Sequence, residues 1–183
     1  VDDQDRPRYS GTVEMALAPE VTPALLEDAP RSVEGTLWSI DRAYSEVLFH
    51  RGPFALIRSL GIVADDSASA ELGGLRTAGW PAADWTSDTA LLDAGLQVAV
   101  LWGHHVLGGG PLPTSLGTFH LVQPGAADAV SRCVLRGRRE GQRKVVLDID
   151  YLTGAGDPIG FVRGLEMHLP PALERPARTN GAA

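Results

Sequence analysis

The chain has 183 residues, 44% of them hydrophobic and 21% charged, which is enough for one well-buried domain and excludes disorder along its whole length. Its net charge of −7 repels a phosphate backbone, so nucleic acid is not an expected partner. The single cysteine, Cys133, excludes an internal disulfide and a cysteine-based metal cluster. Its position in an alternating apolar run predicts a buried structural thiol and fits a reducing cytoplasm.

The two ends of the chain differ from its middle in composition. The polar start, VDDQDRPR, is not typical of a signal peptide, and the missing initiator Met fits a piece of a longer protein. No apolar stretch is expected to span a membrane, so we expect a cytoplasmic protein without a membrane partner. Residues 171–183 are rich in Ala, Pro and Arg and are predicted to form a flexible tail.

Alternating and turn-forming residues suggest the elements of the first half. Arg8–Leu17 alternates enough for a strand, and the Pro- and Glu-rich stretch Ala18–Arg31 has the character of a linker. Apolar residues at helical spacing predict a short helical turn over Ser39–Phe49. Two strands are then expected, over Phe54–Ala64 and Ser67–Leu75.

The strongest helix pattern of the chain covers Leu91–Val106. Ser87 or Asp88 can cap its start, and the run Gly108-Gly-Gly-Pro111 ends it. The segment is apolar nearly all round, which is typical of a helix buried inside a protein.

Strand-like stretches follow this helix to the end of the ordered sequence. They cover Leu116–Val122, Ala129–Arg138, Lys144–Leu152 and Phe161–Leu169. Residue pattern alone therefore predicts an α+β fold with one buried helix.

Three motifs, in order, narrow this fold class to a family. They are YSEVLFHRGPFALIRSL at Tyr44–Leu60, LLDAGLQ at Leu91–Gln97 and LPTSLGTFHL at Leu112–Leu121. Together they resemble the second, C-terminal hotdog half of the dehydratase domain of polyketide and polyunsaturated-fatty-acid synthases. The resemblance implies a hotdog fold, half of a double hotdog, in which an antiparallel sheet wraps around one long buried helix. It assigns residues 38–170 to the hotdog domain and residues 1–37 to the end of a preceding hotdog strand plus a linker.

The resemblance also implies a reaction, the elimination of water from a β-hydroxyacyl thioester on an acyl carrier protein to give an enoyl thioester. Asp93 matches the family's general acid, and Gln97, one turn later on the same face, matches the residue that helps orient this Asp or the hydroxyl group. The base is a histidine on the first hotdog. His50, Pro53 and Phe54 match a loop that shapes the substrate tunnel. No cofactor or metal is implied.

Other interpretations remain open at this point. Asp93 could simply favour the positive end of the helix dipole and cap free backbone N–H groups. The family's HGPxFQ loop reads HRGPFA here, so Gly-Pro is displaced by one position and Ala55 replaces Gln. This departure favours a degenerate, non-catalytic hotdog with a structural or docking role in a synthase. A hotdog acyl thioesterase formed by self-association, as a homodimer, is a further alternative.

The source of the catalytic histidine is the main open question. His104, Gly108 and Pro113 fit the first-hotdog pattern H-x-x-x-G-x-x-x-x-P, but His104 follows Asp93 by eleven residues on one helix, which separates them by ~16 Å. We therefore interpret this match as a coincidence and expect another hotdog, a second half or a homodimer partner, to supply the base. The chain has five histidines, which are His50, His104, His105, His120 and His168.

Overall fold

The computed structural model describes residues 11–12, 35–80, 84–85, 87–120 and 131–170. Apart from Gly11 and Thr12, the strand expected over Arg8–Leu17 lies outside the described residues, as do the linker Ala18–Arg31 and the tail 171–183. The division of the chain at residue 38 therefore stays a prediction.

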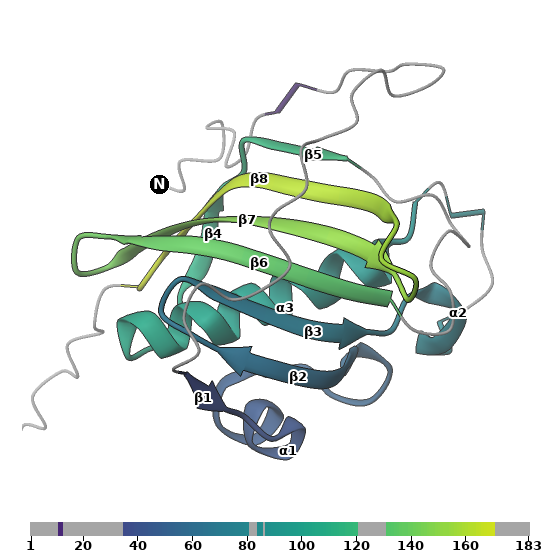
Figure 1. Ribbon diagram of the computed structural model, residues 1–183, viewed down its shortest axis with the longest axis horizontal. Helices are drawn as coiled ribbons and strands as arrows, with labels where there is room; N and C mark the ends of the chain where they lie inside the picture. Colours follow the sequence, from purple (N-terminus) through teal and green to yellow (C-terminus); the bar gives the residue numbers. More distant parts are fainter. Residues whose placement is uncertain (1–10, 13–34, 81–83, 86, 121–130, 171–183) are drawn as a thin grey trace, which may run out of the picture.

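One antiparallel sheet and one long helix make up most of the described part (Figure 1). The sheet order is β1-β2-β3-β6-β7-β8-β4, with β5 also paired to β8. The strands are β1 Thr36–Leu37, β2 Ile57–Val63, β3 Ser67–Leu72, β4 Leu112–Ser115, β5 Thr118–His120, β6 Ser131–Glu140, β7 Lys144–Thr153 and β8 Pro158–His168. The helical elements are α1 Ile40–Arg42, a π-helical turn Ala43–Val47, a 3-10 turn Gly52–Phe54, α2 Leu75–Ala78 and α3 Thr89–Leu107.

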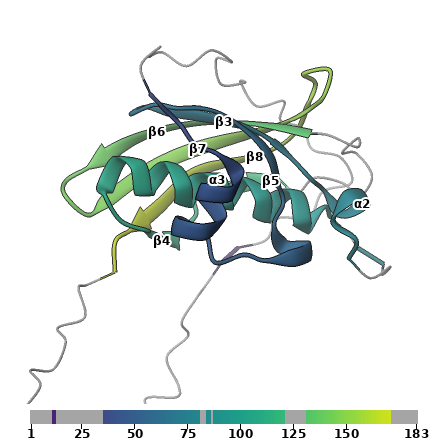
Figure 2. The same ribbon diagram turned by 90° about the horizontal axis from the view of Figure 1, so that it is seen from below.

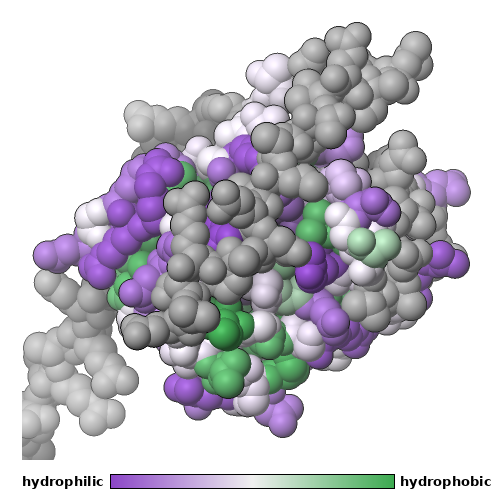
Figure 3. All heavy atoms as spheres, viewed as in Figure 1, coloured by the Kyte–Doolittle hydropathy of each residue, from purple (hydrophilic) through white to green (hydrophobic). Residues whose placement is uncertain are grey.

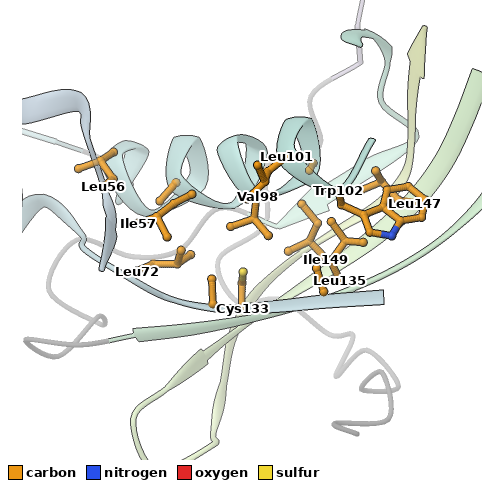
Figure 4. Close-up of a cluster of buried hydrophobic side chains, with 14 of the residues drawn as sticks. Leu56, Ile57, Leu72, Val98, Leu101, Trp102, Cys133, Leu135, Leu147 and Ile149 are labelled. Carbon is orange, nitrogen blue, oxygen red and sulfur yellow. The ribbon is translucent and has the colours of Figure 1, made fainter. Parts of the chain in front are cut away.

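The sheet curves over α3, which lies along its inner face (Figure 2). Side chains alternate between the two faces of a strand, and the inward ones of β7, Val145, Leu147, Ile149 and Tyr151, are all buried. Figure 4 shows apolar side chains of α3 and of the strands meeting between helix and sheet. The predicted hotdog fold is confirmed, with the core formed where the sheet wraps the helix.

Most expected elements are present, with small differences in their ends. The helix begins two residues earlier than expected and ends one residue later, at Leu107. The strand expected over Leu116–Val122 is different: within its described part only Thr118–His120 is a strand, β5. A second short strand, β4, precedes the expected range, and the two pair with separate parts of β8. β8 is itself irregular, because its register with β7 shifts between Leu147 and Ile149. A partner strand cannot follow such an irregular edge in one straight run.

The expectation that no stretch reaches membrane-spanning length was wrong for α3. Its 19 residues, Thr89–Leu107, are long and apolar enough to cross a membrane by length and composition. The same segment is the central helix of the hotdog, and ten of its residues are buried against the rest of the fold. Its apolar character is explained by this position in the core.

The two edges of the sheet carry exposed apolar side chains. Figure 3 shows hydrophilic side chains over the hairpin between β6 and β7, whereas hydrophobic ones gather near β1 and β2. Leu37 on β1 is 76% exposed. At the opposite edge, Leu112 on β4 and Phe119 on β5 are 54% and 44% exposed. Edge strands with exposed apolar residues are typical of surfaces that pair with another domain.

Close contact between α3 and β7 leads to a prediction on stability. Tyr151 is fully buried, donates a hydrogen bond from its hydroxyl to the carbonyl of Leu92 at 3.0 Å, and lies directly against Gly95. A Cβ at Gly95 would collide with the Tyr151 ring and hydroxyl. We expect Gly95→Ala to lower the free energy of unfolding by ~1–3 kcal/mol, as overpacking does, measured by urea denaturation.

Gly110→Ala is the matched control for this substitution, because a Cβ there would meet nothing within 4 Å. It should change the free energy of unfolding by less than ~0.5 kcal/mol. Equal stability of the two variants would mean that Tyr151 is not packed against the helix as described.

Candidate active site

The amino-terminal half of α3 positions the candidate site. Asp88 begins the helix as its N-cap, accepting hydrogen bonds from the backbone N–H of Leu91 at 2.9 Å and of Leu75 at 3.0 Å. Of the two caps the sequence allowed, Asp88 is therefore the one used. Because Asp88 occupies the cap, Asp93 in the second turn of α3 is free for another role, and helix capping does not explain it.

Asp93 and Gln97 lie one helical turn apart and contact each other. The Gln97 amide donates from Nε2 to Oδ2 of Asp93 at 2.7 Å. Gln97 is only 1% exposed, whereas the Asp93 side chain is 37% exposed. The pair therefore combines a fixed, buried amide with a carboxyl group that a small molecule can reach.

Two further hydrogen bonds hold Gln97 in place. Its Nε2 also donates to the carbonyl of Phe54 at 2.9 Å, and its Oε1 accepts from the Tyr44 hydroxyl at 2.7 Å. The Tyr44 oxygen in turn accepts from the backbone N–H of Ile57 at 2.9 Å. Burial raises the pKa of the Tyr44 hydroxyl. This group therefore keeps its proton at neutral pH and can donate a hydrogen bond to the Gln97 amide oxygen.

His50 is the histidine that the fold brings to Asp93. Its Nε2 lies 3.9 Å from Oδ2 of Asp93, and its side chain is 14% exposed. The ring stacks on Phe49 with centroids 4.2 Å apart. Among the described residues, Nδ1 of His50 is buried and has no hydrogen-bond partner. A carboxyl and an imidazole, two groups able to transfer protons, thus lie 3.9 Å apart at the head of the helix.

The altered loop between His50 and Ala55 keeps a defined shape. Arg51 donates to the carbonyls of Leu48 at 2.8 Å and His50 at 2.7 Å, and Gly52 adopts φ +57°, a left-handed conformation that glycine adopts at little cost. The displaced Gly-Pro pair is thereby accommodated in a short 3-10 turn that ends at Phe54.

The other end of this loop carries aromatic side chains. The carbonyl of Pro53 accepts a hydrogen bond from Nε1 of Trp80 at 2.9 Å. The Phe54 ring is 51% exposed and lies 5.2 Å from the Trp80 ring, which lies 5.8 Å from that of Trp85. Of the predicted loop residues, His50 meets Asp93 through its side chain, while Phe54 meets Gln97 through its backbone.

The remaining histidines lie elsewhere in the fold. His104 and His105 are in the last turn of α3, where His104 meets the edge of Trp38 and His105 contacts Asp65 at 3.2 Å. His120 stacks on Phe161, and His168 bonds Thr114 at 2.6 Å. The match of His104 to the first-hotdog pattern thus falls at the opposite end of the helix from Asp93.

The cysteine has the predicted structural role. Cys133 points from β6 into the core (Figure 4) and is fully buried. Burial raises its pKa to about 12, so the thiol stays protonated at neutral pH and is a poor nucleophile.

Sequence reasoning did not assign a role to Tyr44, Trp80 or Trp85. Tyr44 and Gln97 are separated by 53 residues, and only the packing of the turn before β2 against α3 brings them together. The helical spacing around Tyr44 indicated which way its segment packs, but a hydrogen bond over such a distance leaves no local pattern in the sequence.

The family model for the polyketide synthase dehydratase N-terminal domain matches residues 21–177 of the chain. The chain belongs to the polyketide synthase dehydratase family. Among curated proteins, none matches it.

Solved structures of dehydratase domains share the fold of this family member. GphF dehydratase 1 is 18% identical with a TM-score of 0.56, covering 78% of this chain and 53% of its own. The trans-AT polyketide synthase dehydratase domain from Brevibacillus brevis is 20% identical with a TM-score of 0.57, covering 73% and 48%. The dehydratase domain of RzxB from Pseudomonas fluorescens is 17% identical with a TM-score of 0.55, covering 73% and 49%. The chain thus spans about half the length of the dehydratase structures it matches.

Proposed function

We propose that the chain is the second hotdog half of a polyketide synthase-type dehydratase. The observation that carries this proposal is the Asp93–Gln97 pair at the head of the central helix, in a member of this family. The matching family model is described by its N-terminal domain. The second half is inferred from LLDAGLQ at the helix head and from the positions of the histidines.

The proposed reaction removes water from a β-hydroxyacyl thioester carried by an acyl carrier protein. A histidine base takes a proton from the α-carbon, the electron pair forms the α,β double bond, and Asp93 protonates the departing β-hydroxyl group as water. Asp93 is suited to the acid role because its carboxyl group is reachable and is oriented by the Gln97 amide. His50, Pro53 and Phe54 would border the substrate. Such a dehydratase would act in the cytoplasm, in the synthesis of polyketides or fatty acids.

Another hotdog is proposed as the source of the base. The chain spans about half the length of its solved relatives, and apolar side chains are exposed at the sheet edges, Leu37 on one side and Leu112 and Phe119 on the other. These features favour pairing with a second hotdog domain, and the proposed partner is a first half that carries the histidine.

This assignment predicts activity that depends on a partner. The chain alone should not dehydrate a β-hydroxyacyl thioester measurably, whereas joining it to a first hotdog half that carries the histidine should give turnover. The measurement is enoyl thioester formation followed by its ultraviolet absorbance. A matched control is the same joined protein with the partner's histidine changed to alanine, which should be inactive.

Two outcomes would contradict the proposal in different ways. Robust turnover by the isolated chain would mean that the base lies within it, and loss of that turnover in His50→Ala would identify His50, whose Nε2 lies 3.9 Å from Asp93. No turnover with any histidine-bearing half would favour a non-catalytic hotdog. The replacement of the family's Gln by Ala55 in the loop supports that second candidate function.

A further inference from the structure

The hydrogen bonds around Tyr44 have fixed donors and acceptors. A backbone N–H can only donate, so the Tyr44 oxygen accepts from Ile57 at 2.9 Å. The one hydrogen of the hydroxyl is then directed at Oε1 of Gln97, 2.7 Å away. Tyr44 therefore acts as a donor toward Gln97.

This donor determines how the Gln97 amide is oriented. With Oε1 facing Tyr44, both hydrogens of Nε2 are available, and they reach Oδ2 of Asp93 at 2.7 Å and the carbonyl of Phe54 at 2.9 Å. In the flipped amide, Oε1 would face two acceptors, a carboxyl oxygen and a carbonyl oxygen. Unpaired acceptors are costly for a side chain that is 1% exposed.

The orientation makes the two oxygens of Asp93 inequivalent. Oδ2 accepts the amide N–H and also lies 3.9 Å from Nε2 of His50. The carbonyl oxygen of a protonated carboxyl group is a better acceptor than its hydroxyl oxygen, so the hydrogen bond accepted by Oδ2 favours the proton of a protonated Asp93 on Oδ1. Oδ1 is therefore the oxygen that would deliver a proton to a leaving hydroxyl group.

We propose that Tyr44 is a positioning residue of this site, which holds the Gln97 amide so that Asp93 presents its proton on Oδ1. The inference rests on the proposed dehydratase function and adds to it a residue that acts through Gln97 without touching the substrate. Tyr44 contacts Ile57 directly, and Gln97 contacts Phe54, so the two side chains together tie the substrate loop to α3.

The test uses the chain joined to a histidine-bearing hotdog half and a β-hydroxyacyl thioester as substrate. Tyr44→Phe removes only the hydroxyl and should lower kcat about tenfold, the effect of one lost hydrogen bond, with KM changed less than about twofold. In a Gln97→Ala background, Tyr44→Phe should have no further effect on kcat, because Tyr44 acts through that amide.

Tyr151→Phe is the matched control. It also removes a buried hydroxyl that donates to a single acceptor, the carbonyl of Leu92, so it should cost similar thermal stability while leaving kcat within about twofold. Three results would overturn the proposal. The first is an unchanged kcat in Tyr44→Phe, and the second is that the effects of Tyr44→Phe and Gln97→Ala on kcat multiply in the double variant. The third is an equal loss of kcat in Tyr151→Phe.

A second measurement separates this inference from the proposed function. Hydrogen exchange of the Gln97 side-chain amide, followed by NMR in the 15N-labelled chain, should accelerate at least about tenfold in Tyr44→Phe and remain slow in Tyr151→Phe. Absent turnover in the joined wild-type protein would refute the dehydratase function. An unchanged exchange rate of the Gln97 amide in Tyr44→Phe would refute the positioning of Gln97 by Tyr44, whether or not the protein converts the substrate.

Discussion

Replacing Asp93 by asparagine should lower the dehydration rate of the complete double hotdog by ~10²–10⁴-fold, the usual contribution of a general acid. Asparagine keeps the size of the side chain and an oxygen that can accept the Gln97 hydrogen bond at the position of Oδ2. What it loses is the transferable proton. The measurement is kcat for a β-hydroxyacyl thioester, with thermal unfolding of the same sample.

Thermal stability should be nearly unchanged in Asp93→Asn, because Asp88 forms the N-cap of α3. Gln97→Ala is the comparison variant and should reduce kcat less than Asp93→Asn does, since an amide that orients the acid does not itself transfer a proton. Wild-type rates in Asp93→Asn would refute the acid assignment and leave the non-catalytic hotdog as the better description.

The largest effect on stability is expected for Trp102→Ala. The Trp102 side chain is fully buried between α3 and the sheet (Figure 4), and its Nε1 donates to the carbonyl of Ala64 at 3.0 Å. Gly137 on β6 leaves room for the indole ring, since a Cβ there would collide with it. Removing the ring leaves a cavity and an unpaired carbonyl, so the free energy of unfolding should fall by ~3–5 kcal/mol in urea denaturation.

Phe49→Ala is the control for this prediction, because Phe49 is 79% exposed and its removal should change stability by less than ~0.5 kcal/mol. Trp102→Phe should lie between the two, since it keeps most of the packing and loses the hydrogen bond. A loss below ~1 kcal/mol in Trp102→Ala would contradict the packing of α3 against β6 described above.

The family resemblance and the helix pattern both came from local features of the sequence. The helix was predictable because Leu91–Val106 is apolar nearly all round, and its caps, Asp88 and Gly108, are local features. β6 and β7 were predictable within two residues at either end because their side chains alternate. The motif LLDAGLQ placed Asp93 and Gln97 one turn apart, and a helix brings residues at that spacing together wherever it packs.

Only the tertiary structure decided what surrounds this pair. The hydrogen bond from Tyr44 and the approach of His50 join the turn before β2 to α3, and neither has a local pattern because each crosses more than one element. The motif LPTSLGTFHL is divided into two strands, β4 and β5, and this division likewise follows from the irregular edge of β8. By itself the sequence determined the family fold, the helix and the carboxyl–amide pair on it, because these depend on short-range periodicity. The orientation of the amide and the partners of the carboxyl group depend on contacts between distant segments, which form only when the sheet wraps the helix.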